Sequence, residues 1–165
     1  GKTILAAEFA GEGGHVVSRE ISEYTTDLIR ENLERMNRRN VEVQVYDATV
    51  HDPEKEKYAD VVLMDVPCSG LGVMGKKRDI KYHATPESLQ SITELQRQIV
   101  AAGWQYVKPH GVLLYSTCTI HRGENQEMAV WITENFPFVL EEERQLLPGT
   151  DETDGFYYAR LRRKA

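Results

Sequence analysis

The chain has 165 residues, 41% of them hydrophobic and 28% charged, which suits one soluble domain with a buried core. Its net charge of −6 and pI near 5.4 argue against a protein that coats nucleic acid without specificity, because such binding needs an excess of Lys and Arg. No apolar stretch approaches membrane-spanning length and nothing at the start resembles a secretion signal, so we expect a cytoplasmic protein without a membrane partner.

Helix and strand patterns alternate along the chain, which predicts an α/β fold with a mostly parallel sheet and helices on both faces. Ser22 offers an N-cap for a long amphipathic helix, and Pro86 stands where another helix begins. No linker or repeat divides residues 1–165, so we expect a single domain. In chain order, the patterns predict a helix over 3–9, a strand over 15–19, a helix after Ser22, strands over 41–46 and 58–65, a helix from Pro86 toward 107, a strand ending near 115, a helix over 124–135, and strands over 138–142 and 156–161.

The chain opens on Gly1-Lys2-Thr3 and then a helix, without the first strand that such a sheet normally places at its centre. We therefore expect an N-terminally truncated sheet. Gly-Lys-Thr is also the end of a phosphate-binding loop motif, but the motif needs an upstream Gly that these residues do not include. A phosphate-binding loop is unsupported on the sequence.

The two cysteines each follow an apolar run that predicts a buried strand. Cys68 lies in Asp65-Val66-Pro67-Cys68-Ser69, and Cys118 lies in Ser116-Thr117-Cys118-Thr119. Ligands bind beyond the carboxyl ends of strands in open α/β sheets, so we expect both thiols in one crevice. A buried structural cysteine is the common alternative for either residue alone, and an even count also permits a disulfide. The five histidines are scattered without ligand spacing, so no metal site is expected.

Basic residues cluster in three places despite the acidic total. Two clusters, over 35–39 and 160–164, are consistent with a solvated surface, and the first also suits the end of a helix. The third cluster lies in the loop that leaves Cys68, which favours a functional role. It consists of Lys76, Lys77, Arg78 and Lys81.

Over essentially all of its length the chain resembles the catalytic domain of the RNA 5-methylcytosine methyltransferases, most closely the bacterial small-subunit ribosomal RNA enzymes of the Sun/Fmu, RsmB type. Both cysteine motifs stand at predicted strand ends and in the family's order, which makes the resemblance specific. It implies a Rossmann-like S-adenosylmethionine-dependent methyltransferase sheet. The matching segments are Gly1-Lys2-Thr3, Glu20, Tyr46-Asp47-Ala48, Asp65-Val66-Pro67-Cys68-Ser69, Ser116-Thr117-Cys118-Thr119, Glu124-Asn125 and Asp154-Gly155-Phe156-Tyr157.

The resemblance implies methylation of cytosine carbon 5 in ribosomal RNA of the small subunit. Carbon 5 is too weak a nucleophile to take a methyl group unaided, so a nucleophile must first add to carbon 6, and a thiolate suits that task. By the resemblance, Cys118 forms this adduct and Cys68 helps to release it. Asp65 is expected to hydrogen-bond the cytosine edge. The basic loop, Lys76, Lys77, Arg78 and Lys81, is expected to contact RNA phosphates.

S-adenosyl-L-methionine is the cofactor that the resemblance implies. Glu20 is expected to accept both ribose hydroxyls, Asp47 to approach the adenine amine, and Gly1 and Lys2 to line the methionine side, with Asp65 beside them. A turn residue after a strand is the alternative for Asp47, and an acid at a helix entry is the alternative for Glu20. Because the first strand is expected to be missing, we expect this chain alone to bind the cofactor poorly and to turn over slowly or not at all.

Two other functions stay open on the sequence. One is a cytosine-C5 methyltransferase that acts on transfer RNA. The other is a non-catalytic RNA-interaction or assembly domain, because a site rather than a scaffold decides function. Methylation of DNA cytosine is less favoured, because it would leave the Thr-Cys segment unexplained.

Overall fold

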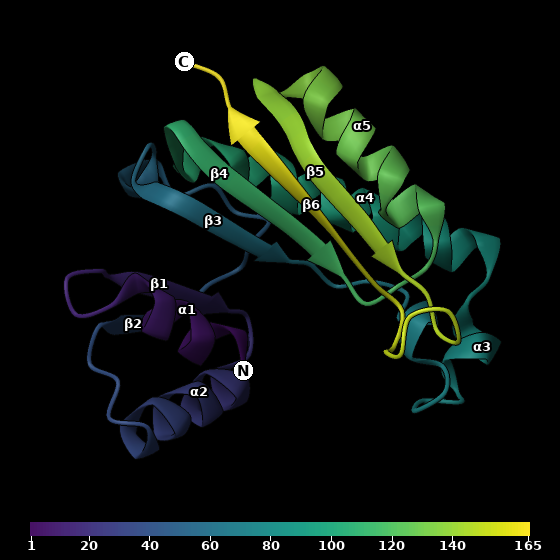
Figure 1. Ribbon diagram of the computed structural model, residues 1–165, viewed down its shortest axis with the longest axis horizontal. Coiled ribbons are helices and arrows are strands. Elements are labelled where there is room, and N and C mark those ends of the chain that lie inside the picture. The colour runs from purple at the N-terminus through teal and green to yellow at the C-terminus, as the bar shows by residue number, and fades with distance from the viewer. The chain divides into compact units, whose positions relative to one another are not determined.

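The computed structural model describes residues 1–165, which form two compact units, residues 1–50 and 51–165 (Figure 1). That the two units belong to one domain stays a prediction. None of the helices combines the length and apolar character needed to cross a membrane. The first unit contains α1 (Lys2–Ala10), β1 (Val16–Glu20), α2 (Glu23–Arg35) and β2 (Val41–Val45). The second contains β3 (Ala59–Asp65), α3 (Ile80–His83), α4 (Pro86–Gly103), β4 (Val107–Thr117), α5 (Gln126–Asn135), β5 (Phe138–Leu146) and β6 (Phe156–Arg163).

The first unit is built on a two-stranded parallel sheet. Strands β1 and β2 pair in register from Val16 opposite Val41 to Glu20 opposite Val45. The carboxyl ends of both strands therefore lie side by side, and Asp47 comes two residues after the end of β2. The predicted helix–strand–helix–strand order of residues 1–50 is confirmed.

Two polar side chains fix the helix ends in this unit. Ser22 Oγ accepts a hydrogen bond from Thr25 N at 3.3 Å, so Ser22 is the N-cap of α2 that the sequence predicts. At the C-terminal end of α1, the Asn40 side-chain amide donates to the carbonyl oxygens of Ala7 and Gly11 at 3.1 and 3.0 Å. These are carbonyl groups at a helix end that have no partner inside the helix. Asn40, which immediately precedes β2, thus ties the helix end to the sheet.

The second unit contains a four-stranded mixed sheet in the order β3-β4-β6-β5. Strands β3 and β4 are parallel, whereas β6 is antiparallel to both of its neighbours. This part of the sheet is therefore not the mostly parallel arrangement that the sequence predicts. The reason is the short connection over 147–155, because a parallel crossover needs a dozen or more residues, usually including a helix.

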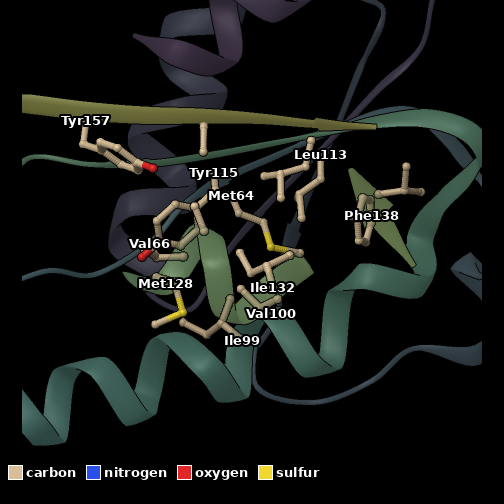
Figure 2. Close-up of a cluster of buried hydrophobic side chains, with 14 residues drawn as sticks. Met64, Val66, Ile99, Val100, Leu113, Tyr115, Met128, Ile132, Phe138 and Tyr157 are labelled. Atoms are coloured by element: carbon tan, nitrogen blue, oxygen red, sulfur yellow. The ribbon is translucent and has the colours of Figure 1, made fainter. Parts of the chain in front are cut away.

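Helices α4 and α5 cover one face of this sheet and enclose the core (Figures 1 and 2). Alternate residues of β4 and β6 point to this face, as the twofold repeat of a strand requires. Figure 2 shows Leu113 and Tyr115 of β4 and Tyr157 of β6 among the side chains of this core, and all three are fully buried. The two helices contribute Ile99, Val100, Met128, Ala129 and Ile132.

Helix α4 begins where Pro86 predicts it. Thr85 is the N-cap: its Oγ1 accepts from Ser88 N at 3.2 Å, while Ser88 Oγ accepts from Thr85 N at 2.9 Å. This reciprocal pair satisfies two donors that the first helical turn would leave without partners. The start of α4 is thereby fixed.

Candidate active site

The two thiols lie side by side beyond the ends of adjacent parallel strands. Strand β3 ends at Asp65, which pairs with Ser116 near the end of β4. The Sγ atoms of Cys68 and Cys118 are 3.1 Å apart, and Cys118 N donates to Cys68 Sγ at 3.3 Å. A disulfide bond would be about 2.05 Å long, so both residues are thiols here. The structure therefore brings together the two cysteines that the sequence separates by fifty positions.

The contact between the sulfurs changes how readily Cys68 loses its proton. The hydrogen bond between the thiols, and after it burial, raises the pKa of Cys68 well above its usual range. Either sulfur can be the donor in this contact. Cys68 therefore keeps its proton more firmly than an isolated thiol does.

Asp65 is the last residue of β3 and its side chain is exposed. Ser116 Oγ donates to Asp65 Oδ1 at 3.2 Å, which connects the carboxylate to the neighbouring strand. Asp65 thus stands three residues before Cys68 on the strand end that leads into the thiol loop. The structure brings the three predicted catalytic residues into one region of the second unit.

A buried carboxylate lies behind the Cys68 loop. Glu124 is completely buried, and its carboxylate accepts from Ser69 N at 2.9 Å, Ser69 Oγ at 2.5 Å and Gln96 Nε2 at 2.9 Å. Gln96 Nε2 also donates to the carbonyl oxygen of Pro67 at 2.9 Å. The residues on both sides of Cys68 are therefore held through Glu124.

The Cys118 loop is connected to the same network. Ser69 Oγ lies 2.7 Å from Thr119 Oγ1, and Thr117 Oγ1 donates to Asn125 Oδ1 at 2.6 Å. Asn125 Nδ2 donates to the carbonyl oxygen of Thr119 at 3.0 Å. Glu124 and Asn125, a pair that matches the family's motif, thus contact one cysteine loop each.

Sequence reasoning missed Gln96 and Thr119 as members of this network. Gln96 is fully buried on α4, next to Leu95 and three residues before Ile99. A polar residue inside an apolar helical stripe was the available indication, because a buried amide needs hydrogen-bond partners. For Thr119 the sequence offered only its place beside Cys118.

Two glycines let the backbones of the site loops approach closely. Gly72 N donates to the carbonyl oxygen of Cys118 at 3.1 Å, and Gly155 N donates to the carbonyl oxygen of Gly72 at 2.8 Å. A Cβ atom on Gly72 would lie 2.3 Å from Gly155 O and 2.8 Å from Cys118 O. Only glycine fits at position 72 without moving the backbone.

Glu20 and Asp47 lie at the shared strand edge of the first unit. Glu20 Oε1 accepts from Ile21 N at 3.0 Å and from Ser22 N at 3.3 Å. Asp47 Oδ1 accepts from the hydroxyl and the backbone N of Thr49, at 2.7 and 2.8 Å, and these bonds lower the pKa of Asp47. In each of the two side chains, one carboxylate oxygen accepts both hydrogen bonds and so orients the group.

The other predicted cofactor residues stand at the start of α1. Lys2 is its first residue, and Gly1 precedes it as the N-cap without a side-chain hydrogen bond. Gly1 and Lys2 thus stand at a helix N-terminus, and the Thr3 hydroxyl lies 3.0 Å from Ser18 Oγ of β1. The first unit brings Glu20 and Asp47 to one edge.

The four residues of the predicted basic loop that follows Cys68 are all exposed, but Lys81 lies in α3 rather than in the loop before it. Its first member is paired, because Lys76 Nζ lies 2.6 Å from Asp154 Oδ2, although both side chains stay accessible to water. Lys81 Nζ lies 4.8 Å from the centre of the Tyr82 ring, and Tyr82 itself is 74% exposed. An exposed ion pair holds little energy, so Lys76 can exchange Asp154 for another anion at low cost.

Comparison with known proteins places the chain among methyltransferases. The family model described as 16S rRNA methyltransferase RsmB/F matches residues 1–162. Ribosomal RNA small subunit methyltransferase F of Escherichia fergusonii is 32% identical over 98% of this chain, which spans only 37% of that protein.

Two solved structures agree with this placement. NSun6 from Pyrococcus horikoshii, solved with SFG, is 25% identical and superposes with a TM-score of 0.86 over the whole chain and 45% of its own length. A SAM-dependent O-methyltransferase from Thermotoga maritima, 16% identical, superposes with a TM-score of 0.62 over 98% of this chain and 54% of its own.

The second of these likenesses concerns the fold alone, and it confirms the predicted Rossmann-like methyltransferase architecture. The family match covers nearly every residue and includes both cysteine loops, so the resemblance inferred from the motifs is confirmed. The chain spans little more than a third of the curated relatives that it matches. By its sequence it belongs to the 16S rRNA methyltransferase RsmB/F family.

Proposed function

We propose that this chain carries the catalytic centre of an S-adenosylmethionine-dependent methyltransferase that modifies carbon 5 of cytosine in small-subunit ribosomal RNA. The observation that carries the proposal is the thiol pair at 3.1 Å, placed at adjacent strand ends beside Asp65. A single cysteine is most often structural, whereas two thiols in hydrogen-bond contact at strand ends suit a reaction that both makes and breaks a sulfur–carbon bond.

In the first step Cys118 acts as the nucleophile. Its thiolate sulfur bonds to carbon 6 of cytosine, and the electron pair of the C5–C6 double bond moves toward carbon 5, which becomes nucleophilic. Asp65 is the group that would hydrogen-bond the cytosine edge and hold the ring during this addition. The bound cofactor supplies an electrophilic methyl group for carbon 5. We assign the donor role in the 3.1 Å contact to Cys68 Sγ–H, which would stabilise the attacking thiolate before the bond forms.

In the second step the carbon-5 proton leaves. The electron pair of that C–H bond restores the C5–C6 double bond, and the pair of the S–C6 bond returns to Cys118. We assign help with this release to Cys68, which takes the proton or passes it to a base. The pKa of Cys68 is raised chiefly by its hydrogen bond to Cys118, and that bond weakens once the Cys118 sulfur is bonded to carbon. Cys68 is thus harder to deprotonate before the adduct forms and easier afterwards, when a base is needed.

The residues present fit the adenosine part of S-adenosylmethionine. Glu20 and Asp47 each use one carboxylate oxygen within the protein and keep the second for a donor such as a ribose hydroxyl or the adenine amine. Support comes from NSun6 of Pyrococcus horikoshii, whose structure contains SFG, an analogue of S-adenosylmethionine. We assign Gly1 and Lys2 to the methionine side, as the family resemblance implies.

Ribosomal RNA is favoured over transfer RNA because the curated relatives that match are named ribosomal RNA small subunit methyltransferases. The reaction is tested with RNA that contains 5-fluorocytosine, in which fluorine replaces the proton that must leave. We expect a covalent complex with a 16S fragment in the presence of S-adenosylmethionine, and peptide mapping should place the RNA on Cys118. Linkage to transfer RNA alone would mean that transfer RNA, and not ribosomal RNA, is the substrate. No linkage to either RNA would favour the non-catalytic alternative.

The exposed cations of the basic loop should contribute a salt-dependent part of RNA binding. Changing Lys77, Arg78 and Lys81 together to Gln removes three charges, so the slope of log K against log salt should fall by roughly 2 for single-stranded RNA, about 0.7 per contact. Titration of RNA at several salt concentrations measures this slope. Changing Arg35, Arg38 and Arg39 to Gln removes the same charge elsewhere and should leave the slope unchanged. Equal slopes in both variants would mean that the basic loop is an ordinary solvated surface that does not contact RNA phosphates.

A further inference from the structure

We infer that Glu124 is a positioning residue that holds the Cys68 and Cys118 thiols against each other. The inference rests on the proposed function, because a fixed thiol pair serves only a reaction that uses both sulfurs. None of the contacts of the Glu124 side chain is with a thiol. Glu124 acts through the residues that flank them.

The surroundings of Glu124 are built for a carboxylate ion. The side chain is fully buried, and a buried charge is strongly unfavourable unless donors surround it. Three groups donate hydrogen bonds to it, Ser69 N, Ser69 Oγ and Gln96 Nε2. One carboxylate therefore organises three donors from two different segments of the chain.

A directed chain of hydroxyl groups joins Glu124 to both cysteine loops. His121 N donates to Thr119 Oγ1 at 3.2 Å, and Thr119 Oγ1 lies 2.7 Å from Ser69 Oγ, which donates to Glu124 Oε1. A backbone N–H can only donate and a carboxylate can only accept, so both hydroxyls point toward Glu124. Thr119 directly follows Cys118, and Ser69 directly follows Cys68. The two residues after the two thiols are thus bonded to each other and to Glu124.

A second arm of the network holds the other side of Cys68. Gln96 Nε2 bridges Glu124 Oε2 and the carbonyl oxygen of Pro67. The Tyr115 hydroxyl then donates to the backbone oxygen of Glu124 at 2.8 Å and lies 3.2 Å from Gln96 Oε1. Because Pro67 and Ser69 are both held, Cys68 has little freedom to move away from Cys118.

Loosening this clamp should change how the thiols titrate. The titratable groups near the pair are the two cysteines themselves, Asp65, Tyr115, Glu124 and His121, whose Nδ1 lies 3.4 Å from Glu124 Oε1. Burial, and after it the Glu124 charge, raises the pKa of Tyr115, so the phenol stays protonated through the neutral range. A separated pair should therefore behave as two ordinary thiols, while a pair in contact keeps Cys68 protonated.

The test is the rate of alkylation by iodoacetamide at each cysteine between about pH 6 and pH 10, followed by peptide mass spectrometry without RNA or cofactor. In the unaltered protein we expect Cys118 to react at least about tenfold faster than Cys68 near pH 8, because only the thiolate reacts. Glu124→Gln keeps the size of the side chain but turns one acceptor oxygen into a donor. The ratio of the Cys118 alkylation rate to the Cys68 alkylation rate should therefore fall to about three or less. Glu127→Gln changes an exposed carboxylate in the first turn of α5, three residues after Glu124, and should leave the ratio of the two alkylation rates unchanged.

Ser69→Ala provides a second, milder variant that removes only the hydroxyl link to Thr119 and Glu124. It should lower the ratio about threefold, and it decides the question alone if Glu124→Gln does not fold. A lower melting temperature with an unchanged ratio would mean that Glu124 only supports the fold, and it would overturn the inference while leaving the proposed reaction intact. Conversely, a changed ratio in a protein that forms no adduct with 5-fluorocytosine RNA would overturn the reaction instead.

Discussion

Cys118→Ala is expected to abolish both methyl transfer and covalent linkage to RNA, whereas Cys68→Ala should leave RNA trapped on the protein. Cys118 supplies the electron pair that bonds to carbon 6 and makes carbon 5 nucleophilic. Loss of a covalent nucleophile slows other enzymes on the order of 10⁶-fold. Cys68→Ala keeps that nucleophile but removes the group assigned to proton release. Its adduct should therefore form with unmodified cytosine and persist.

Denaturing gel electrophoresis of the protein with RNA and S-adenosylmethionine measures both results. A slow band should appear with Cys68→Ala, and none with Cys118→Ala or the double variant. Ser91→Ala, in α4 and away from the thiol loops in sequence, is a suitable control that should turn over without a trapped complex. If Cys68→Ala prevented the adduct and Cys118→Ala left it intact, the two roles would be exchanged.

Gly72→Ala should be the most damaging small substitution near the site. Its Cβ atom would lie 2.3 Å from Gly155 O and 2.8 Å from Cys118 O, and both are backbone atoms that no side-chain rotation can move aside. We expect an overpacking cost of about 1–3 kcal/mol in the free energy of unfolding. The Cys118 loop should also shift, because Gly72 N no longer meets Cys118 O at 3.1 Å.

Urea denaturation measures the free energy, and the yield of the 5-fluorocytosine adduct reports the shift of the loop. Gly75→Ala is the matched control, because a Cβ there meets nothing within 4 Å. Its free energy of unfolding should change by less than about 0.5 kcal/mol. Equal losses in both variants would show that the loop tolerates no side chain anywhere, and that the close approach at Gly72 is not the cause.

The sequence by itself was sufficient for the elements with strong local patterns. Pro86 placed the start of α4, Ser22 placed that of α2, and the apolar runs before Cys68 and Cys118 placed β3 and β4. These features depend on neighbours within a few residues, and so they can be read along the chain. The short helix α3, Ile80–His83, was missed because four residues do not complete an amphipathic repeat.

The family also followed from sequence, because two cysteine motifs in order are specific where one dipeptide is not. The direction of β6 did not follow, since an apolar strand pattern is the same in a parallel and an antiparallel pair. The connection over 147–155 decides it, and its shortness matters only once the neighbouring strands are known.

Only the tertiary structure decided what raises the pKa of Cys68. Its motif gives no sign of this shift, which arises from a 3.1 Å contact with a thiol fifty positions away and, after it, from burial. The contact in turn depends on Gln96, Glu124 and Thr119, which come together from α4 and the loop after β4. Hydrogen bonds and pKa shifts act over a few ångströms in space, so distances along the sequence do not reveal them.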